Sequence, residues 1–114
     1  MNKTVITRIW HGRTRSIHAD TYLNYVGETG IREYRSIPGN LSAKILRRKE
    51  GDVCHFWTVT EWDNMDSIRR FAGDDFEKAR YYPMDKEYLL EFEEKVIHCE
   101  TFQAEFNFIK DNNI

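Results

Sequence analysis

The chain has 114 residues and a mass of 13.7 kDa, which predicts one domain without a second core. Its 17 basic and 19 acidic residues are spread along the sequence and give a net charge of -2, so no positive field favours nucleic acid or an anionic membrane. The 7 Phe, 6 Tyr and 3 Trp supply large apolar areas for burial, which argues against disorder.

The N-terminus reaches a charged side chain before any apolar stretch of signal-peptide length, and no later segment is long enough to span a membrane. We therefore expect a cytoplasmic protein. Cys54 and Cys99 lie far apart, and neither has a second Cys or His at the spacing of a zinc site. Both are expected to be reduced, buried and inert.

The first half of the chain predicts a strand, a helix and a turn. Alternating β-branched and aromatic residues predict a first strand over 4–12. Helical spacing predicts a helix over 20–26, and the nearby glycines predict a break near Gly30 before a short helical piece over 31–35. A Pro-Gly-Asn turn at 38–40 follows.

The middle of the chain predicts a β-hairpin followed by a helix. The strands are expected over 41–49 and 53–62, and the second is apolar on both faces. Asn64 predicts the N-cap of a helix that ends at Gly73.

The last third predicts a further helical turn around Phe76 and Ala79, and then a short helix over 85–90 with Asp85 as its N-cap. A final strand is expected over 92–102, and the tail over 105–114 is expected to fray.

The predicted order of strand, helix, strand, strand, helix, strand is that of an α+β, ferredoxin-like βαββαβ fold with an antiparallel sheet. In this fold the last strand lies beside the first, the first beside the third, and the second at the far edge. Cys54 and Cys99 would then lie two strand spacings apart, about 10 Å, which is beyond the roughly 7 Å limit for a disulfide.

The strand over 53–62 predicts a homodimer, because it places His55 and Trp57 on one face and Cys54 and Phe56 on the other. Helices of a domain this small cover only one face of the sheet, so a second copy is expected to cover the other. The alternative is that Trp57 and His55 stay partly exposed.

Three motifs, Trp10-His11-Gly12, Pro38-Gly39-Asn40 and Thr60-Glu61-Trp62-Asp63, resemble those of the antibiotic biosynthesis monooxygenase family. The segment Phe71-Ala72-Gly73 followed by Tyr81-Tyr82-Pro83-Met84-Asp85 is similar to an uncharacterised branch of that family. The resemblance covers residues 4–102 of the single 1–114 domain. It implies an oxidoreductase that forms a dimeric α+β barrel, with a pocket between sheet and helices in each subunit. The best-known members oxygenate polycyclic phenols without metal or flavin, and others degrade haem.

The haem-degrading members of the family carry an Asn before an Arg on the first strand, a Trp that ends the third strand, and a His on the second helix. In this sequence Thr7 precedes Arg8, Trp62 matches the Trp, and the position of the iron-ligating His falls near Ala72. A haem would lack its axial ligand without that imidazole. The sequence therefore disfavours haem degradation, and no cofactor is expected.

A cofactor-independent monooxygenase needs a dry pocket for a flat aromatic substrate and a base that removes a proton from it. We expect Trp10, Trp62, Tyr81 and Tyr82 to line this pocket and bind the substrate. The two tyrosines have a structural alternative, in which they pack at a helix stop before Pro83.

The candidate base is His11, with His18 and His98 as alternatives, because imidazole titrates near neutral pH. His11 is favoured because it ends a strand beside Gly12. Each of these histidines has the alternative of a packed or hydrogen-bonded structural role.

No metal site is expected, because no two of the four histidines have a spacing that puts two ligands on one face. His11 and His55 are also predicted to fall at opposite ends of strands that run parallel, which would keep them apart. Two functions therefore stay open. One is a cofactor-independent monooxygenase acting on a small aromatic or quinone-like metabolite. The other is a non-catalytic dimer of the same fold that binds a small hydrophobic ligand or serves as an accessory protein.

Overall fold

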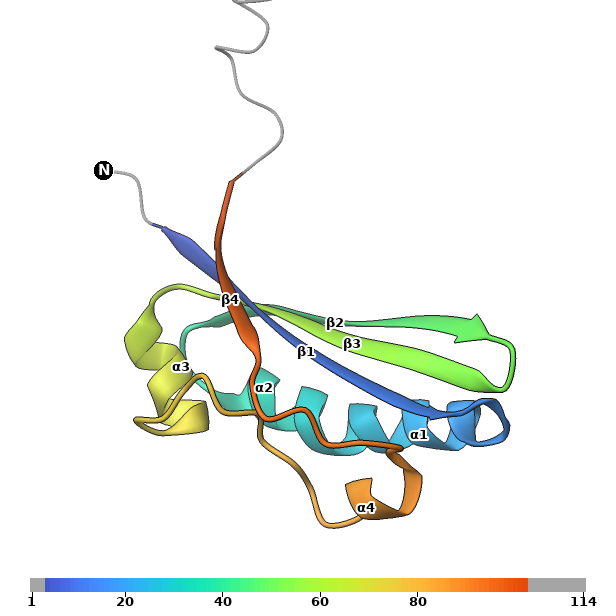
Figure 1. Ribbon diagram of the computed structural model, residues 1–114. Coiled ribbons are helices and arrows are strands. Elements are labelled where there is room, and N and C mark those ends of the chain that lie inside the picture. Colours follow the sequence, from blue (N-terminus) through green and yellow to red (C-terminus); the bar gives the residue numbers. More distant parts are fainter. Residues whose placement is uncertain (1–3, 103–114) are drawn as a thin grey trace, which may run out of the picture.

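A four-stranded antiparallel sheet carries its helices on one face in the computed structural model, which describes residues 4–102 (Figure 1). The predicted tail over 105–114 lies outside the described residues. In chain order the elements are β1 (Val5–Arg15), η1 (Ser16–His18), α1 (Ala19–Val26), η2 (Gly27–Ile31), α2 (Arg32–Ser36), β2 (Asn40–Glu50), β3 (Val53–Trp62), α3 (Met65–Ala72), α4 (Asp85–Tyr88) and β4 (Ile97–Thr101).

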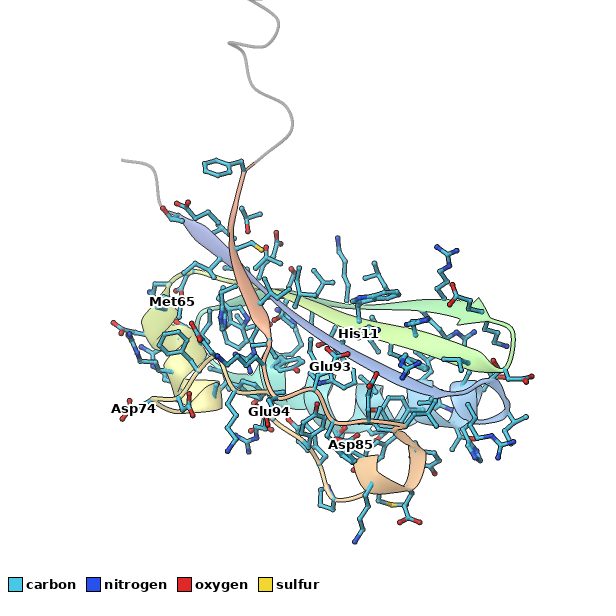
Figure 2. All side chains as sticks on the ribbon, viewed as in Figure 1. His11, Met65, Asp74, Asp85, Glu93 and Glu94 are labelled. Carbon is cyan, nitrogen blue, oxygen red and sulfur yellow. The ribbon has the colours of Figure 1, made fainter. Side chains whose placement is uncertain are left out.

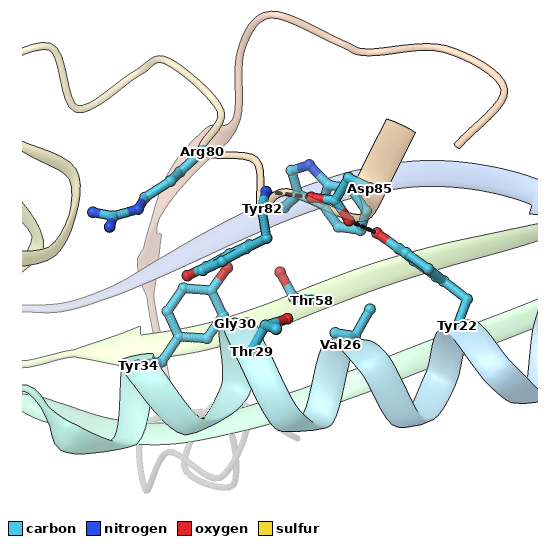
Figure 3. A pocket seen from close by; sticks show the side chains of 10 residues that line it. Tyr22, Val26, Thr29, Gly30, Tyr34, Thr58, Arg80, Tyr82 and Asp85 are labelled. Carbon is cyan, nitrogen blue, oxygen red and sulfur yellow. Dashed lines mark hydrogen bonds between the residues drawn. The ribbon is translucent and has the colours of Figure 1, made fainter. Parts of the chain in front are cut away.

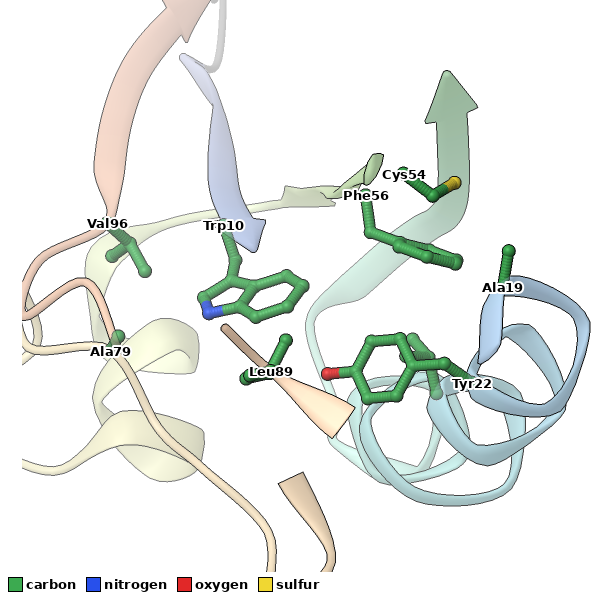
Figure 4. Close-up of a cluster of buried hydrophobic side chains, with 9 residues drawn as sticks. Trp10, Ala19, Tyr22, Cys54, Phe56, Ala79, Leu89 and Val96 are labelled. Atoms are coloured by element: carbon green, nitrogen blue, oxygen red, sulfur yellow. The ribbon is translucent and has the colours of Figure 1, made fainter. Parts of the chain in front are cut away.

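The strand order β2-β3-β1-β4 and the three antiparallel pairings confirm the predicted α+β, ferredoxin-like fold. Side chains alternate between the two faces of β1 and β3. On the face toward the helices, Trp10, Tyr22, Phe56 and Leu89 belong to one buried cluster (Figure 4). The core is therefore one layer of helix packed on one face of the sheet.

Gly12 allows the indole of Trp10 to lie flat against β1. A Cβ atom at position 12 would stand 2.4 Å from Cη2 of Trp10, which is closer than nonbonded carbon atoms approach. The absence of a side chain at Gly12 therefore leaves the space that the ring of Trp10, two residues earlier on the same strand, occupies.

The predicted helix break near Gly30 is wrong. The chain continues as one helical rod through α1, η2 and α2, and both glycines lie in the wider turn η2. Val26, Gly30 and Tyr34 are buried at intervals of four residues, so they form one stripe against the sheet. Packing of this stripe outweighs the helix-propensity cost of about 1 kcal/mol for each glycine.

The predicted helical turn around Phe76 and Ala79 is also wrong. The amide of Ala79 donates to the carbonyl of Glu94 at 2.7 Å, and the amide of Val96 donates to the carbonyl of Glu77 at 2.8 Å. This short antiparallel bridge lies outside the sheet and uses residues that were assigned to the last strand. β4 is therefore shorter than the predicted range of 92–102.

The boundaries of α3 agree with the sequence prediction, whereas those of α4 differ from it. Asn64 caps α3 as predicted, since its side chain accepts from the amide of Ser67 at 3.0 Å, and Gly73 ends the helix with a φ of +83°. α4 ends at Tyr88, earlier than predicted, and Asp85 is its first residue rather than its N-cap. The carboxyl group of Asp85 is used elsewhere, as described below.

The antiparallel pairings of β1 with β3 and with β4 correct two predictions. His11 lies opposite Trp57, which places Nε2 of His11 3.0 Å from Nδ1 of His55 rather than at the far end of the strand. Cys54 is buried as predicted, but Cys99 is exposed because β4 turns it to the sheet face that has no helices. Within residues 4–102, no helix is long and apolar enough to cross a membrane.

Candidate active site

A small pocket lies between the helical rod and the sheet, beneath the segment that leads into α4 (Figure 3). Its volume is about 20 Å³, which is room for a single water molecule. The residues that line it come from β1, α1, η2, α2, β3, the segment before α4 and the first residue of α4; they are Trp10, Tyr22, Val26, Thr29, Gly30, Tyr34, Thr58, Arg80, Tyr82 and Asp85.

The carboxyl group of Asp85 is the one acidic group among the lining residues, and Asp85 is only 4% exposed. Tyr22 donates its hydroxyl hydrogen to Oδ1 at 2.8 Å, and the backbone N–H of Tyr82 donates to Oδ2 at 2.6 Å (Figure 3). Burial raises the pKa of Asp85 above its ordinary value of 3.8, although these two hydrogen bonds favour the charged form. Asp85 is therefore a stronger base than an exposed carboxylate.

The local sequence holds Asp85 in place through a tight turn. Asp85 donates its own amide hydrogen to the carbonyl of Tyr82 at 2.9 Å, so the turn closes on both sides of Pro83. The amide of Met84 donates to the hydroxyl of Tyr25 on α1 at 2.9 Å. The carboxyl group is thus fixed by contacts from α1 and from its own turn.

The tyrosines of the pocket act as neutral hydrogen-bond donors. Burial raises the pKa of Tyr22 and of Tyr82 above the ordinary value of 10.0, with the neighbouring acids Asp85 and Glu33 adding to the effect. Burial also raises the pKa of Tyr34, and the guanidinium of Arg8 opposes this shift. These hydroxyl groups therefore keep their protons at neutral pH.

Arg80 and Glu33 lie at one end of the pocket. Nη2 of Arg80 is 3.3 Å from Oε2 of Glu33, and Nη1 donates to the carbonyl of Phe71 at 2.7 Å. The hydroxyl of Tyr82 donates to Oε1 of Glu33 at 2.5 Å. Both carboxylate oxygens of Glu33 are therefore engaged by residues that line the pocket.

The indole of Trp10 forms one wall of the pocket and carries an unused hydrogen-bond donor. Its Nε1 is buried and has no partner among the residues that the structure describes. The ring meets Tyr81 edge to face, with 6.3 Å between ring centroids. A buried donor without a partner costs free energy, so it favours a bound water or ligand that supplies an acceptor.

The structure brings Trp10 and Tyr82 together in the pocket, and Tyr81 packs behind Trp10 with its hydroxyl on the carbonyl of Glu93. Trp62 lies in a second buried cluster with Tyr34 and donates from Nε1 to Oγ1 of Thr60 at 2.8 Å. Trp62 does not line the pocket.

His11 lies on the sheet face without helices, where its Nδ1 is 2.5 Å from Oε2 of Glu93 (Figure 2). His98 is held against Arg8 with 3.0 Å between Nε2 and Nη1, and burial together with this cation lowers its pKa to about 4. His18 packs on Tyr88. None of the residues that line the pocket is a histidine.

Tyr22, Tyr34 and Arg80 line the pocket although no sequence pattern predicts it, and Asp85 lines it as well, where the sequence predicts a helix cap. Tyr22 and Asp85 are 63 residues apart, so no local motif signals their hydrogen bond. Within residues 4–102, no group of three or more His, Cys, Asp or Glu side chains is placed to hold a metal ion.

No protein-family model matches the sequence, and no curated protein matches it. Solved structures do match. A candidate antibiotic biosynthesis monooxygenase from Nitrosomonas europaea is 8% identical with a TM-score of 0.65, and the alignment covers 91% of this chain and 96% of that one. SnoaB, a cofactor-independent oxygenase from Streptomyces nogalater, is 14% identical with a TM-score of 0.53 and coverages of 91% and 97%.

A heme-degrading protein from Mycobacterium tuberculosis is 14% identical with a TM-score of 0.56, and the alignment covers 93% of this chain and 100% of that one. Identities this low establish the fold and nothing finer. The chain has the fold of the antibiotic biosynthesis monooxygenases, as its sequence motifs predicted.

The raised pKa of Asp85 predicts how stability depends on pH. The folded protein holds the Asp85 proton more tightly than the unfolded chain, so the stabilisation is complete below pH 3.8 and is lost as pH rises through the folded pKa. The free energy of unfolding of the wild type, relative to that of Asp85→Asn, should therefore fall across this range. Urea denaturation from about pH 3 to pH 8 measures it.

Asp66→Asn is the matched control, because the side chain of Asp66 is 79% exposed on α3. Its difference from the wild type should not show that fall. A constant difference between wild type and Asp85→Asn, or one that rises with pH, would contradict the assignment.

Proposed function

We propose that the protein is a monooxygenase that acts on a small aromatic or quinone-like metabolite without metal or flavin, with Asp85 as its general base. One observation carries the proposal: a buried carboxyl group with a raised pKa lies in a pocket walled by an indole and three tyrosines. The fold shared with monooxygenases, including a cofactor-independent oxygenase, supports it.

The chemistry follows from the proton that Asp85 accepts. Removal of an acidic hydrogen from a reduced polycyclic phenol leaves an anion that can transfer one electron to O₂. The substrate radical and superoxide then combine into a peroxide anion, which takes the proton back from Asp85. The resulting hydroperoxide loses water and leaves a carbonyl where a CH₂ group stood. The substrate supplies all the electrons, and the residues supply a base, a position and exclusion of water.

Each residue has a distinct role in this proposal. Tyr22 orients the carboxyl of Asp85 through its hydroxyl, and Trp10 supplies a flat apolar surface for an aromatic ring. The unpartnered Nε1 of Trp10 offers a donor to an oxygen of the substrate. Tyr82 closes the pocket from the segment before α4.

Haem degradation does not fit these residues. α3, which spans Met65–Ala72, contains no histidine, and His98 is held by Arg8 instead of facing the pocket. Trp62 shares its type with the haem-degrading members, but it is fully buried with its Nε1 on Thr60. The likeness to a heme-degrading protein is therefore a likeness of fold.

The size of the pocket favours a second candidate function. Binding sites for drug-sized ligands have volumes of about 300–1,000 Å³, and this cavity of about 20 Å³ holds one water. A polycyclic substrate enters only if Arg80 and Tyr82 move outward. A non-catalytic dimer that binds a small ligand at the same place is the alternative that this observation supports.

Oxygen consumption with an anthrone, in the presence of a chelator and without added metal or flavin, tests the first candidate. Asp85→Asn should lower the rate about 10²- to 10⁴-fold, because it removes the base but keeps the shape of the side chain. His11→Ala discriminates between the two candidate bases, since His11 lies on the other face of the sheet. A loss confined to His11→Ala would overturn the assignment to Asp85.

If anthrones bind and quench tryptophan fluorescence but no oxygen is consumed above the uncatalysed rate, catalysis on this substrate class is excluded. The alternative, a non-catalytic dimer that binds a small ligand, then replaces the proposed monooxygenase.

We further propose that two copies pair through the sheet face that has no helices. On this face Trp57 of β3 lies between His11 of β1 and Leu46 of β2, and Trp57 is only half-buried. Leu46 and Ile97 on the neighbouring strands are 46% and 61% exposed. A twofold-related copy would bury this apolar surface with its own.

Trp57→Glu should weaken the dimer at least about 30-fold, because loss of a central aromatic contact costs about 2 kcal/mol or more. Light scattering across a dilution series measures the effect. Ile17→Glu is the matched control, since Ile17 is 73% exposed in η1, outside the sheet. A wild-type protein that is monomeric at micromolar concentration would contradict the proposal.

A further inference from the structure

Two residues of the pocket hold a carboxylate that belongs to the chain itself. The hydroxyl of Tyr82 donates to Oε1 of Glu33 at 2.5 Å, and Nη2 of Arg80 lies 3.3 Å from Oε2. A hydroxyl donor and a guanidinium together form a set that suits a carboxylate, because charge-assisted hydrogen bonds reach both of its oxygens. The side chain of Glu33 is 32% exposed, so water reaches this end of the pocket.

Glu33 comes from a different element than the residues that hold it. It lies in the first turn of α2, while Arg80 and Tyr82 lie in the segment before α4. The contact therefore ties that segment to the helical rod at one end of the pocket, whose volume is about 20 Å³. Any substrate that enters from this end meets Arg80 and Tyr82 first.

Arg80 is prepared for an anion bound to an aromatic ring. Its guanidinium carbon lies 5.2 Å from the centroid of the Phe71 ring and 5.9 Å from that of Tyr82. These rings and the carbonyl of Phe71 fix the guanidinium even when Glu33 leaves. Glu33 then moves into water, where its charge is solvated.

The opposite ends of Tyr82 set the length of the ligand. Its hydroxyl binds Glu33, and its backbone N–H binds the carboxyl of Asp85. Figure 3 shows the hydroxyl of Tyr82 and the guanidinium of Arg80 on the side of the pocket away from Asp85. The two acidic groups therefore contact opposite ends of Tyr82, and a ligand that reaches both has to extend along this side chain.

We propose that Arg80 and Tyr82 form a subsite for a carboxylate of the substrate, that Glu33 fills this subsite while no substrate is bound, and that the substrate is an aromatic acid. The inference rests on the proposed function, because it takes the pocket as the place where the aromatic substrate binds. The carboxylate of the substrate displaces Glu33, and its ring system extends toward Trp10 and Asp85.

Binding of 6-hydroxy-2-naphthoate tests the subsite, because this probe carries a carboxylate and a phenol at opposite ends of two fused rings. 2-Naphthol, which lacks the carboxylate, is the reference ligand. Glu33→Ala should bind the naphthoate at least about tenfold more tightly than the wild type, because the competing carboxylate is gone. The affinity for 2-naphthol should change less than threefold. Fluorescence titration measures both.

Two further variants complete the test. Adding Arg80→Gln to Glu33→Ala should remove the gain for the naphthoate. Glu28→Ala is the matched control, because Glu28 lies on the same helical rod and, among residues 4–102, pairs only with exposed Arg32 at 3.7 Å; it should bind like the wild type. Circular dichroism checks that each variant folds.

An equal gain for both ligands would show a wider entrance without an anion subsite, and it would overturn the proposal. A gain that persists without Arg80, or no gain at all, would overturn it as well. If Glu33→Ala does not fold, Glu33→Gln keeps an acceptor for Tyr82 and removes only the charge that faces Arg80. It should then raise the affinity for the naphthoate at least threefold, and an unchanged affinity would overturn the proposal.

The test separates this inference from the proposed function, because it measures binding without turnover. Selective binding of the naphthoate by Glu33→Ala, together with no oxygen consumption by the wild type, would leave the subsite in place and remove the catalytic role.

Discussion

The carboxyl group of Asp85 is the point at which the pocket is held together. It accepts hydrogen bonds from Tyr22 on α1 and from the backbone of Tyr82, so one side chain joins the helical rod to the segment that covers the pocket. No cation lies within ion-pair distance of Asp85 among residues 4–102. Two neutral donors compensate burial only in part, which is why its pKa is raised. Buried Asp85 thus both joins the helical rod to the covering segment and carries a carboxyl group of raised pKa.

Access to the pocket depends on the segment that carries its hydrogen-bond donors. Tyr82 contacts Asp85 at one end and Glu33 at the other, and Arg80 joins the second contact. In the binding mode proposed above, the carboxylate of the substrate takes the place of Glu33 at Arg80 and Tyr82. The internal carboxylate of Glu33 then holds this segment on the helical rod until a ligand with suitable chemistry replaces it. Closure of the pocket and selectivity for a carboxylate then depend on the same two residues, Arg80 and Tyr82.

The sheet was predictable from the sequence and the site was not. The order of strand, helix, strand, strand, helix, strand predicted the strand order β2-β3-β1-β4, and Asn64 marked the start of α3 correctly. The predicted helix break at Gly30 is wrong because packing of the buried stripe on the helical rod outweighs the low helix propensity of glycine. Asp85 was assigned as a helix cap because its partner Tyr22 is 63 residues away, and nothing local encodes such a contact. Of the predicted lining residues, Trp10 and Tyr82 reach the pocket, whereas Trp62 points into a separate cluster.

Infrared difference spectroscopy tests the central claim most directly, because it observes the proton on Asp85. When an anthrone binds under anaerobic conditions and ionises, no oxygen consumes the anion and the proton stays on its acceptor. The account predicts a new band from a protonated carboxyl group, shifted by ¹³C-labelled aspartate and absent in Asp85→Asn. Ionisation of the bound anthrone without this band, or a band that persists in Asp85→Asn, would contradict it.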